Sequence, residues 1–151
     1  MKKVFKVLTL FVTIATLALL SACTKDNAKK ILGTWNFVHV DIVMTADDPE
    51  VQEFVDEFLG AMVDEMNNEL SGFVFDFKAD NTVVITYTDV ETHQTESETA
   101  QYSVDGDIIT FDGDEMTIKT LTNNSLVLVV SDTFDEDGIT GTVVETLEFK
   151  R

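Results

Sequence analysis

The sequence predicts a mainly β domain: an eight-stranded antiparallel up-and-down barrel with one amphipathic helix inserted between the first and second strands. Short runs rich in β-branched and aromatic residues alternate between apolar and polar positions. Turn-forming pairs such as Asp105-Gly106 and Asp112-Gly113 separate these runs at short intervals. Many short strands with regularly spaced turns are typical of an antiparallel sandwich or an up-and-down barrel.

Eight runs of the chain have strand character. Phe73, Phe75 and Phe77 share one face of the second run, because successive side chains of a strand point to opposite sides. The link at 79–81 is short enough to join the second and third strands in a hairpin. We expect the strands at 32–43, 73–78, 82–90, 98–104, 107–111, 115–121, 125–133 and 139–149.

The helical segment, at about 48–70, interrupts the strand pattern. Its apolar residues recur at spacings of three and four, which gives a continuous apolar stripe. Asp48 is a good N-cap, and Pro49 suits the first helical position. Ser71-Gly72 ends the helix. A helix of this length is roughly 30 Å long, enough to cross one mouth of a small barrel.

Charge excludes some classes of partner. The formal net charge is −18, and from residue 31 onward four cations stand against 27 acids, a balance of −23. Such a chain is not expected to bind nucleic acid, because it would repel the phosphate backbone. It would also repel an anionic bilayer, so membrane attachment has to be covalent. The acidic surface either keeps an exported protein soluble or attracts a cationic partner.

The first 22 residues have the pattern of a signal peptide. Residues 1–6 are cationic, and 7–20 form an apolar run too short to span a bilayer comfortably. The sequence LSAC at 20–23 then resembles the lipobox of bacterial lipoproteins. This resemblance implies that residues 1–22 are removed and that Cys23, the one cysteine of the chain, takes a diacylglyceryl group.

Residues 23–30 are therefore expected to be the acylated cysteine followed by a polar, solvated tether. Thr24 after the cysteine is compatible with sorting to the outer membrane, and Lys25-Asp26 resembles the surface-export signals of Bacteroidetes lipoproteins. We expect a protein of the bacterial cell envelope, held by its lipid anchor on the periplasmic or the surface face of the outer membrane.

Gly33 and Trp35, in the run GTW, resemble the Gly-x-Trp motif that opens the first strand of lipocalins. The resemblance implies a lipocalin-like barrel over residues 31–151, similar to the lipocalin-like domains common in Bacteroidetes. It also implies that Trp35 closes one end of the barrel under a basic residue from the end of the last strand. Arg151 or Lys150 could fill that role.

The helix departs from this family pattern. Classical lipocalins carry a helix after the barrel, whereas here it falls between the first two strands. If the helix lies over the open mouth with Phe54, Phe58 and Met62 pointing inward, it would act as a lid over an enclosed apolar site. A helix that simply packs on the barrel and completes its core is the alternative.

We expect a binding protein that holds a small hydrophobic ligand inside the barrel. The rival hypothesis is a protein-interaction or structural module whose barrel is filled by its own side chains. The period-2 phase of the strands places ten residues inward, where they would contact the ligand: Phe73, Phe75, Phe77, Ile85, Tyr87, Tyr102, Leu126, Leu128, Val143 and Leu147.

The sequence carries no catalytic motif such as Gly-x-Ser-x-Gly or a glycine-rich phosphate loop, so we expect no enzyme activity. His39 and His93 have no second ligand at metal spacing, so neither a metal nor a cofactor is expected. The acidic run at 132–138 fails the EF-hand pattern, because Val144 stands where the bidentate Glu should be. Weak calcium binding there and the identity of any protein partner stay open.

Overall fold

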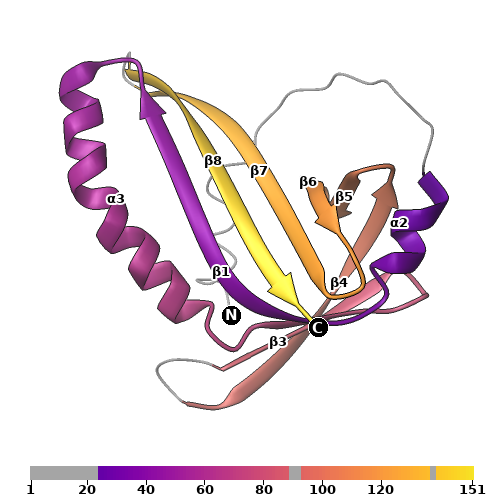
Figure 1. Cartoon of the computed structure of the whole chain (residues 1–151). Coiled ribbons are helices and arrows are strands. Elements are labelled where there is room, and N and C mark those ends of the chain that lie inside the picture. Colours follow the sequence, from indigo (N-terminus) through magenta and orange to yellow (C-terminus); the bar gives the residue numbers. More distant parts are fainter. Residues whose placement is uncertain (1–23, 89–92, 137–138) are drawn as a thin grey trace.

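The computed structural model describes residues 24–88, 93–136 and 139–151 (Figure 1). In these residues eight antiparallel strands form a closed barrel, in which each strand pairs with the next and β8 returns to β1. The predicted fold class is confirmed, and every predicted strand or helix end lies within three residues of the observed one. The strands are β1 (Gly33–Ala46), β2 (Val74–Phe77), β3 (Thr82–Thr88), β4 (Thr95–Asp105), β5 (Ile108–Phe111), β6 (Asp114–Leu121), β7 (Ser125–Glu136) and β8 (Ile139–Lys150).

In the part of the chain that the structure describes, two helices accompany the barrel, α2 (Thr24–Lys30) and α3 (Pro49–Glu69). The predicted cap of α3 is confirmed, since Oδ1 of Asp48 accepts a hydrogen bond from the backbone N–H of Glu50 (2.8 Å). After the helix, Gly72 has a φ of +89°, a conformation that glycine adopts without strain. Within the described residues no helix is long and apolar enough to span a bilayer.

The predicted signal peptide, residues 1–22, and the lipidation site Cys23 lie outside the described residues. Residues 24–30, expected as a solvated tether, instead form α2, so that prediction is wrong. The helix packs against β4. Nδ2 of Asn27 donates hydrogen bonds to the carbonyl of Gly106 (3.0 Å) and to Oδ1 of Asp107 (2.8 Å), which holds the segment on the barrel.

Trp35 closes one end of the barrel. Its ring is fully buried, and its Nε1 donates a hydrogen bond to the carbonyl of Ile31 (2.6 Å). The guanidinium carbon of Arg151 lies 4.1 Å from the centroid of the Trp35 ring, so the contact expected from the end of the last strand is confirmed. At an exposed site such a cation–π contact contributes about 0.5–1 kcal/mol.

Arg151 also ties the end of the chain to the start of the barrel. Its Nη2 donates hydrogen bonds to the carbonyls of Lys30 (2.8 Å) and Leu32. The next residue, Gly33, has a φ of +107°, which side chains rarely tolerate. A Cβ there would lie 3.7 Å from Nη2 of Arg151, an ordinary van der Waals contact, so the constraint comes from the backbone conformation. The glycine of the motif is therefore required by the backbone turn beside the arginine.

The other half of β1 has a helix as its neighbour instead of a strand. The pairing of β2 with β1 ends at Asn36, although β1 continues to Ala46 with β8 on its other edge. Along the free edge, the backbone N–H of Val40 donates to Oδ1 of Asn67 (2.8 Å), and Nδ2 of Asn67 donates back to the carbonyl of Val40 (2.9 Å). One amide side chain of α3 thus makes the two hydrogen bonds that a neighbouring strand would make.

A second amide side chain, near the start of α3, bonds the same edge of β1. The backbone N–H of Ala46 donates to Oε1 of Gln52 (2.7 Å), and Nε2 of Gln52 donates to the carbonyl of Met44 (3.3 Å). Between the two amides, Val55 is buried, and Leu59 and Val63 pack against the core. α3 therefore forms part of the barrel wall beside β1 (Figure 1).

The predicted lid orientation is wrong. Phe54 and Phe58 are each 60% exposed and Met62 is 39% exposed, so all three point to solvent and not into the barrel. The apolar stripe of α3 is too wide for all of its residues to contact the barrel. The side that includes Val55 packs on β1. The alternative hypothesis, a helix that packs on the barrel and completes its core, agrees with the structure.

We predict that Asn67→Ala lowers the free energy of unfolding by about 1–3 kcal/mol, because it leaves both backbone polar groups of Val40 without partners. Asn68→Ala removes the neighbouring exposed amide and is the matched control, with an expected change below about 0.5 kcal/mol. Urea denaturation followed by circular dichroism measures both values. Equal effects of the two substitutions would contradict the edge-pairing role of Asn67.

Candidate functional site

On β2 and β7, inward side chains become less buried from the Trp35 end of the barrel to the opposite end, whereas Tyr87 of β3 and Val143 of β8 stay buried toward that end. Along β2, Phe77 is 2% exposed, whereas Phe75 and the preceding Phe73 are only partly buried. The inward residues of β7 change in the same way, from fully buried to partly exposed, in the order Leu126, Leu128, Val130, Asp132 and Phe134. We call the end away from Trp35 the open end.

Aromatic rings fill the barrel near Trp35. The ring centroids of Phe77 and Tyr102 are 4.9 Å apart, and those of Phe75 and Phe149 are 5.0 Å apart. Phe111 lies within 6.1 Å of both Phe75 and Phe77. Offset and edge-to-face ring pairs at these separations are favourable beyond the area they bury. This half of the barrel is a packed core.

A separate ring pair lies toward the open end. Phe73 and Tyr87 stack with their centroids 5.1 Å apart and their planes 16° from parallel. The hydroxyl of Tyr87 donates a hydrogen bond to Oε2 of Glu96 (3.2 Å). Tyr87 is buried and Phe73 is partly exposed, so the accessible ring of this pair lies beside a polar group and offers an apolar face with a possible orienting contact for a ligand.

The structure places the predicted barrel residues together. All ten belong to the hydrophobic core or pack against it: Phe73, Phe75, Phe77, Ile85, Tyr87, Tyr102, Leu126, Leu128, Val143 and Leu147. The predicted phase of the strands is therefore confirmed. The three helix residues Phe54, Phe58 and Met62 do not join them. Contact of any of these residues with a ligand stays a prediction.

Carboxylates share the inner face with these apolar residues, and four of them lie toward the open end. Glu96 and Glu98 follow the inward phase of β4, opposite Tyr87 and Ile85 of β3. On the facing side, Asp132 of β7 and Glu145 of β8 stand opposite Val143 and Val130. All four side chains are partly buried. Every described Lys and Arg side chain is exposed or lies outside this face, so the inner wall is acidic near the open end.

Burial perturbs two of these acids. Desolvation raises the pKa of Glu145, and the charge of Asp132 raises it further. Desolvation also raises the pKa of Asp132. The register puts the two residues at diagonal positions of neighbouring strands, which are roughly 7–8 Å apart. In the described residues neither carboxylate accepts a hydrogen bond from another side chain or the backbone, so contact with solvent alone offsets the cost of its partial burial.

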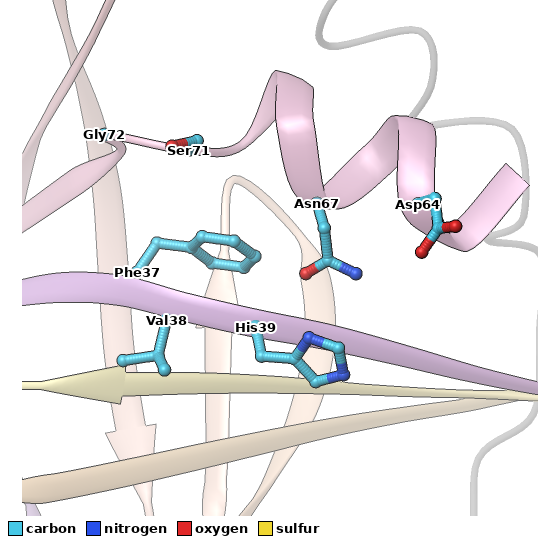
Figure 2. Close-up of a pocket in the computed structure, with 7 residues that line it drawn as sticks. All are labelled: Phe37, Val38, His39, Asp64, Asn67, Ser71 and Gly72. Atoms are coloured by element: carbon cyan, nitrogen blue, oxygen red, sulfur yellow. The ribbon is translucent and has the colours of Figure 1, made fainter. Parts of the chain in front are cut away.

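A pocket of about 270 Å³ lies outside the barrel, where β1 meets the last turns of α3 (Figure 2). Figure 2 shows the ring of Phe37 and the side chain of His39 on one side, with Asn67 and Asp64 of the helix on the other. The Phe37 ring also contacts Phe149 of the core (5.9 Å between centroids). The pocket is small for a ligand site, and the amide of Asn67 is already used by β1.

The histidines do not form a metal centre in the described residues, where no group of three His, Cys, Asp or Glu side chains could hold an ion. His39 lines the outer pocket, and His93 lies before β4 with a φ of +55°. Asp132, the first residue of the acidic run at 132–138, lies within β7, as the predicted strand at 125–133 has it, and β7 extends to Glu136.

A comparison with known proteins bears on this arrangement. A family model described as a lipocalin-like domain matches residues 31–128 of the 151-residue chain. The chain belongs to this lipocalin-like family. The resemblance inferred from Gly33 and Trp35 is thereby confirmed. No curated protein and no solved structure matches the chain significantly.

The lipocalin-like match covers β1 to the first residues of β7, and it leaves out β8, which contains Glu145, and the following Arg151.

The inner carboxylates were not among the predicted site residues. The signal was present, because the period-2 phase that assigns Tyr102 and Leu147 to the inside also assigns Glu98 and Glu145 to it. An acid on the inner face of a strand is unexpected only if the barrel is buried along its whole length.

We predict that Glu145→Gln stabilises the protein at pH 7.5, raising the thermal midpoint by a few degrees. The pKa of Glu145 is raised in the folded state, so its protonated carboxyl contributes stability that is fully present below the ordinary pKa of 4.5. That contribution is lost as the pH rises through the folded-state pKa. The gain should therefore disappear near pH 4. Glu148→Gln, on the exposed face of β8, is the control. Differential scanning fluorimetry at both pH values checks this, and a gain at pH 4 as large as at pH 7.5 would contradict it.

Proposed function

We propose that this protein is a lipid-anchored lipoprotein of the bacterial cell envelope that binds a small, largely apolar ligand at the open end of its lipocalin-like barrel. The family and the barrel support binding of a small ligand. The lipid anchor and the location in the outer membrane rest on the sequence pattern at 1–26.

The burial gradient along the inner face carries the ligand proposal. On β2 an apolar side chain stays accessible toward the open end, because Phe73 is partly exposed while Phe77 is 2% exposed. Apolar side chains that remain accessible on a concave face are the usual lining of a small-molecule site. Glu96, held by Tyr87, offers a polar contact at the same end.

The position of α2 supports attachment close to a bilayer. The helix begins at Thr24, directly after the proposed acylation site, and is docked on the barrel by Asn27. Acylation of Cys23 would then hold the barrel against the membrane surface without an intervening flexible tether. Several acyl chains are needed for stable anchoring, at about 0.8 kcal/mol per buried methylene.

The second candidate function is a protein-interaction or structural module. The aromatic packing of Phe75, Phe77, Phe111 and Phe149 favours it, because these rings fill half of the barrel. Under this hypothesis the inner wall near Phe73 would be too shallow to enclose a ligand. Small barrels are commonly filled by their own side chains.

We predict that residues 24–151, which contain every described element, bind the neutral fluorophore N-phenyl-1-naphthylamine. Phe73→Ala should weaken this binding about tenfold, because it removes one ring of the stacked pair. Thr86→Ala, on the outer face of β3, is the control and should leave the affinity unchanged. Fluorescence titration gives the affinities, and native mass spectrometry after exposure to a bacterial lipid extract tests natural ligands. Absence of both dye binding and bound mass would favour the interaction module.

The anchor requires its own experiment. In a Gram-negative host fed with labelled palmitate, the wild-type chain should incorporate label and sediment with membranes, whereas Cys23→Ala should incorporate none. Extraction with sodium carbonate separates anchored protein from adsorbed protein. Labelling of Cys23→Ala equal to that of the wild type would contradict acylation at this residue.

A further inference from the structure

The outer side of α3 carries an apolar surface that the barrel does not use. Phe54, Phe58 and Met62 follow one another at spacings of four and are 60%, 60% and 39% exposed. The two phenylalanine rings stack on each other, with centroids 4.8 Å apart. Residues at this spacing lie one above the other on a helix surface. We call these three residues the α3 stripe.

The fold does not require the α3 stripe. The helix is held on β1 by its other side, through Val55, Leu59 and Val63 and through the amides of Asn67 and Gln52. A polar side chain at Phe54 or Phe58 would serve the solvent side of such a helix equally well. Adjacent exposed apolar side chains that the core does not need mark an interaction surface.

Acidic side chains border the stripe. Glu50 and Glu57 lie four and three positions from Phe54, and Glu65 lies three positions from Met62, so all three are its neighbours on the helix surface. All three side chains are exposed. Residues 31–77, which include β1, α3 and β2, contain no Lys or Arg. The field around the stripe is therefore negative without local compensation.

We propose that the α3 stripe docks a cationic amphipathic segment of another protein, with apolar side chains against Phe54 and Phe58 and Lys or Arg side chains beside the bordering acids. Charge complementarity selects this occupant. A second copy of the chain would bring the same acids to the contact, and an anionic bilayer surface would be repelled in the same way. An amphipathic segment on a hydrophobic surface is a common mode of peptide recognition.

The placement of α3 leaves the stripe open to such a partner. α3 and α2 lie on opposite sides of the barrel (Figure 1). The chain leads from α2 toward Cys23, so an anchor at that residue would hold the α2 side nearest the bilayer and leave the α3 side directed away from it. The docking proposal itself does not depend on a ligand inside the barrel.

The test uses the full chain in phosphatidylcholine nanodiscs and a fluorescein-labelled peptide of Leu and Lys at helical spacing, with empty nanodiscs as the baseline. We predict saturable binding that Phe54→Ala/Phe58→Ala weakens about tenfold. Glu57→Gln/Glu65→Gln should weaken it about threefold and reduce its salt dependence. Fluorescence anisotropy at two salt concentrations measures these changes, and circular dichroism confirms that each variant folds.

Two matched controls separate the stripe from general effects. Val43→Ala removes apolar surface from an exposed position of β1, and Glu115→Gln/Glu148→Gln removes two acids from the outer faces of β6 and β8. Both should bind the peptide as the wild type does. Equal loss in these controls would overturn the proposal, because binding would then follow overall charge.

Other occupants give distinguishable results, and each would overturn the proposal. A peptide with Glu in place of Lys that binds equally well would show a purely apolar contact. Self-association that Phe54→Ala/Phe58→Ala abolishes would assign the stripe to a second copy. If the Cys23→Ala chain, which lacks the lipid anchor, bound phosphatidylcholine vesicles through the α3 stripe, the stripe would be assigned to the bilayer. Absence of any binding of the Leu/Lys peptide would also overturn it.

Discussion

The need of β1 for backbone hydrogen bonds on both edges shapes this barrel. β8 serves one edge along most of the strand, but β2 leaves the other edge at Asn36. An unpaired strand edge costs free energy when it is buried and invites aggregation when it is exposed. Asn67 and Gln52 lessen both problems, because their amides bond the backbone of Val40, Met44 and Ala46 along this edge. The insertion of a helix between the first two strands is thus part of how the barrel closes.

The two ends of the barrel differ in burial and in charge. At one end Trp35, Arg151 and the rings around Phe77 form a dense core tied to the start of the chain. At the other end the same inner face carries Glu145 and Asp132, whose raised pKa values record the cost of placing charge near apolar neighbours. Replacement of these acids by neutral residues is expected to stabilise the fold, and their presence fits an end that stays accessible to solvent.

α3 joins two surfaces of opposite kind. Its inner side completes the wall through Val55 and the two amides, and its outer side displays Phe54 and Phe58 among acids. A ligand site at the open end and a docking site on α3 would share the strand β1, to which the helix is bound by direct hydrogen bonds. Such contact provides a physical route by which a partner on the helix could alter access to the barrel.

Much of this protein is determined by its sequence alone. Period-2 runs, turn pairs and the Asp48 cap depend on local sterics and hydrogen bonding, so strand order, the helix and the inward residues could be predicted, as could the pairing of Trp35 with Arg151 once the family motif was seen. Other features were decided only by the tertiary structure. The apolar stripe of α3 is wide enough for either Phe54 or Val55 to face the barrel, and β1 selects Val55 because Asn67 and Gln52 must reach its backbone. Which inward acids become costly depends equally on the whole barrel, because burial is set by neighbours far apart in the chain.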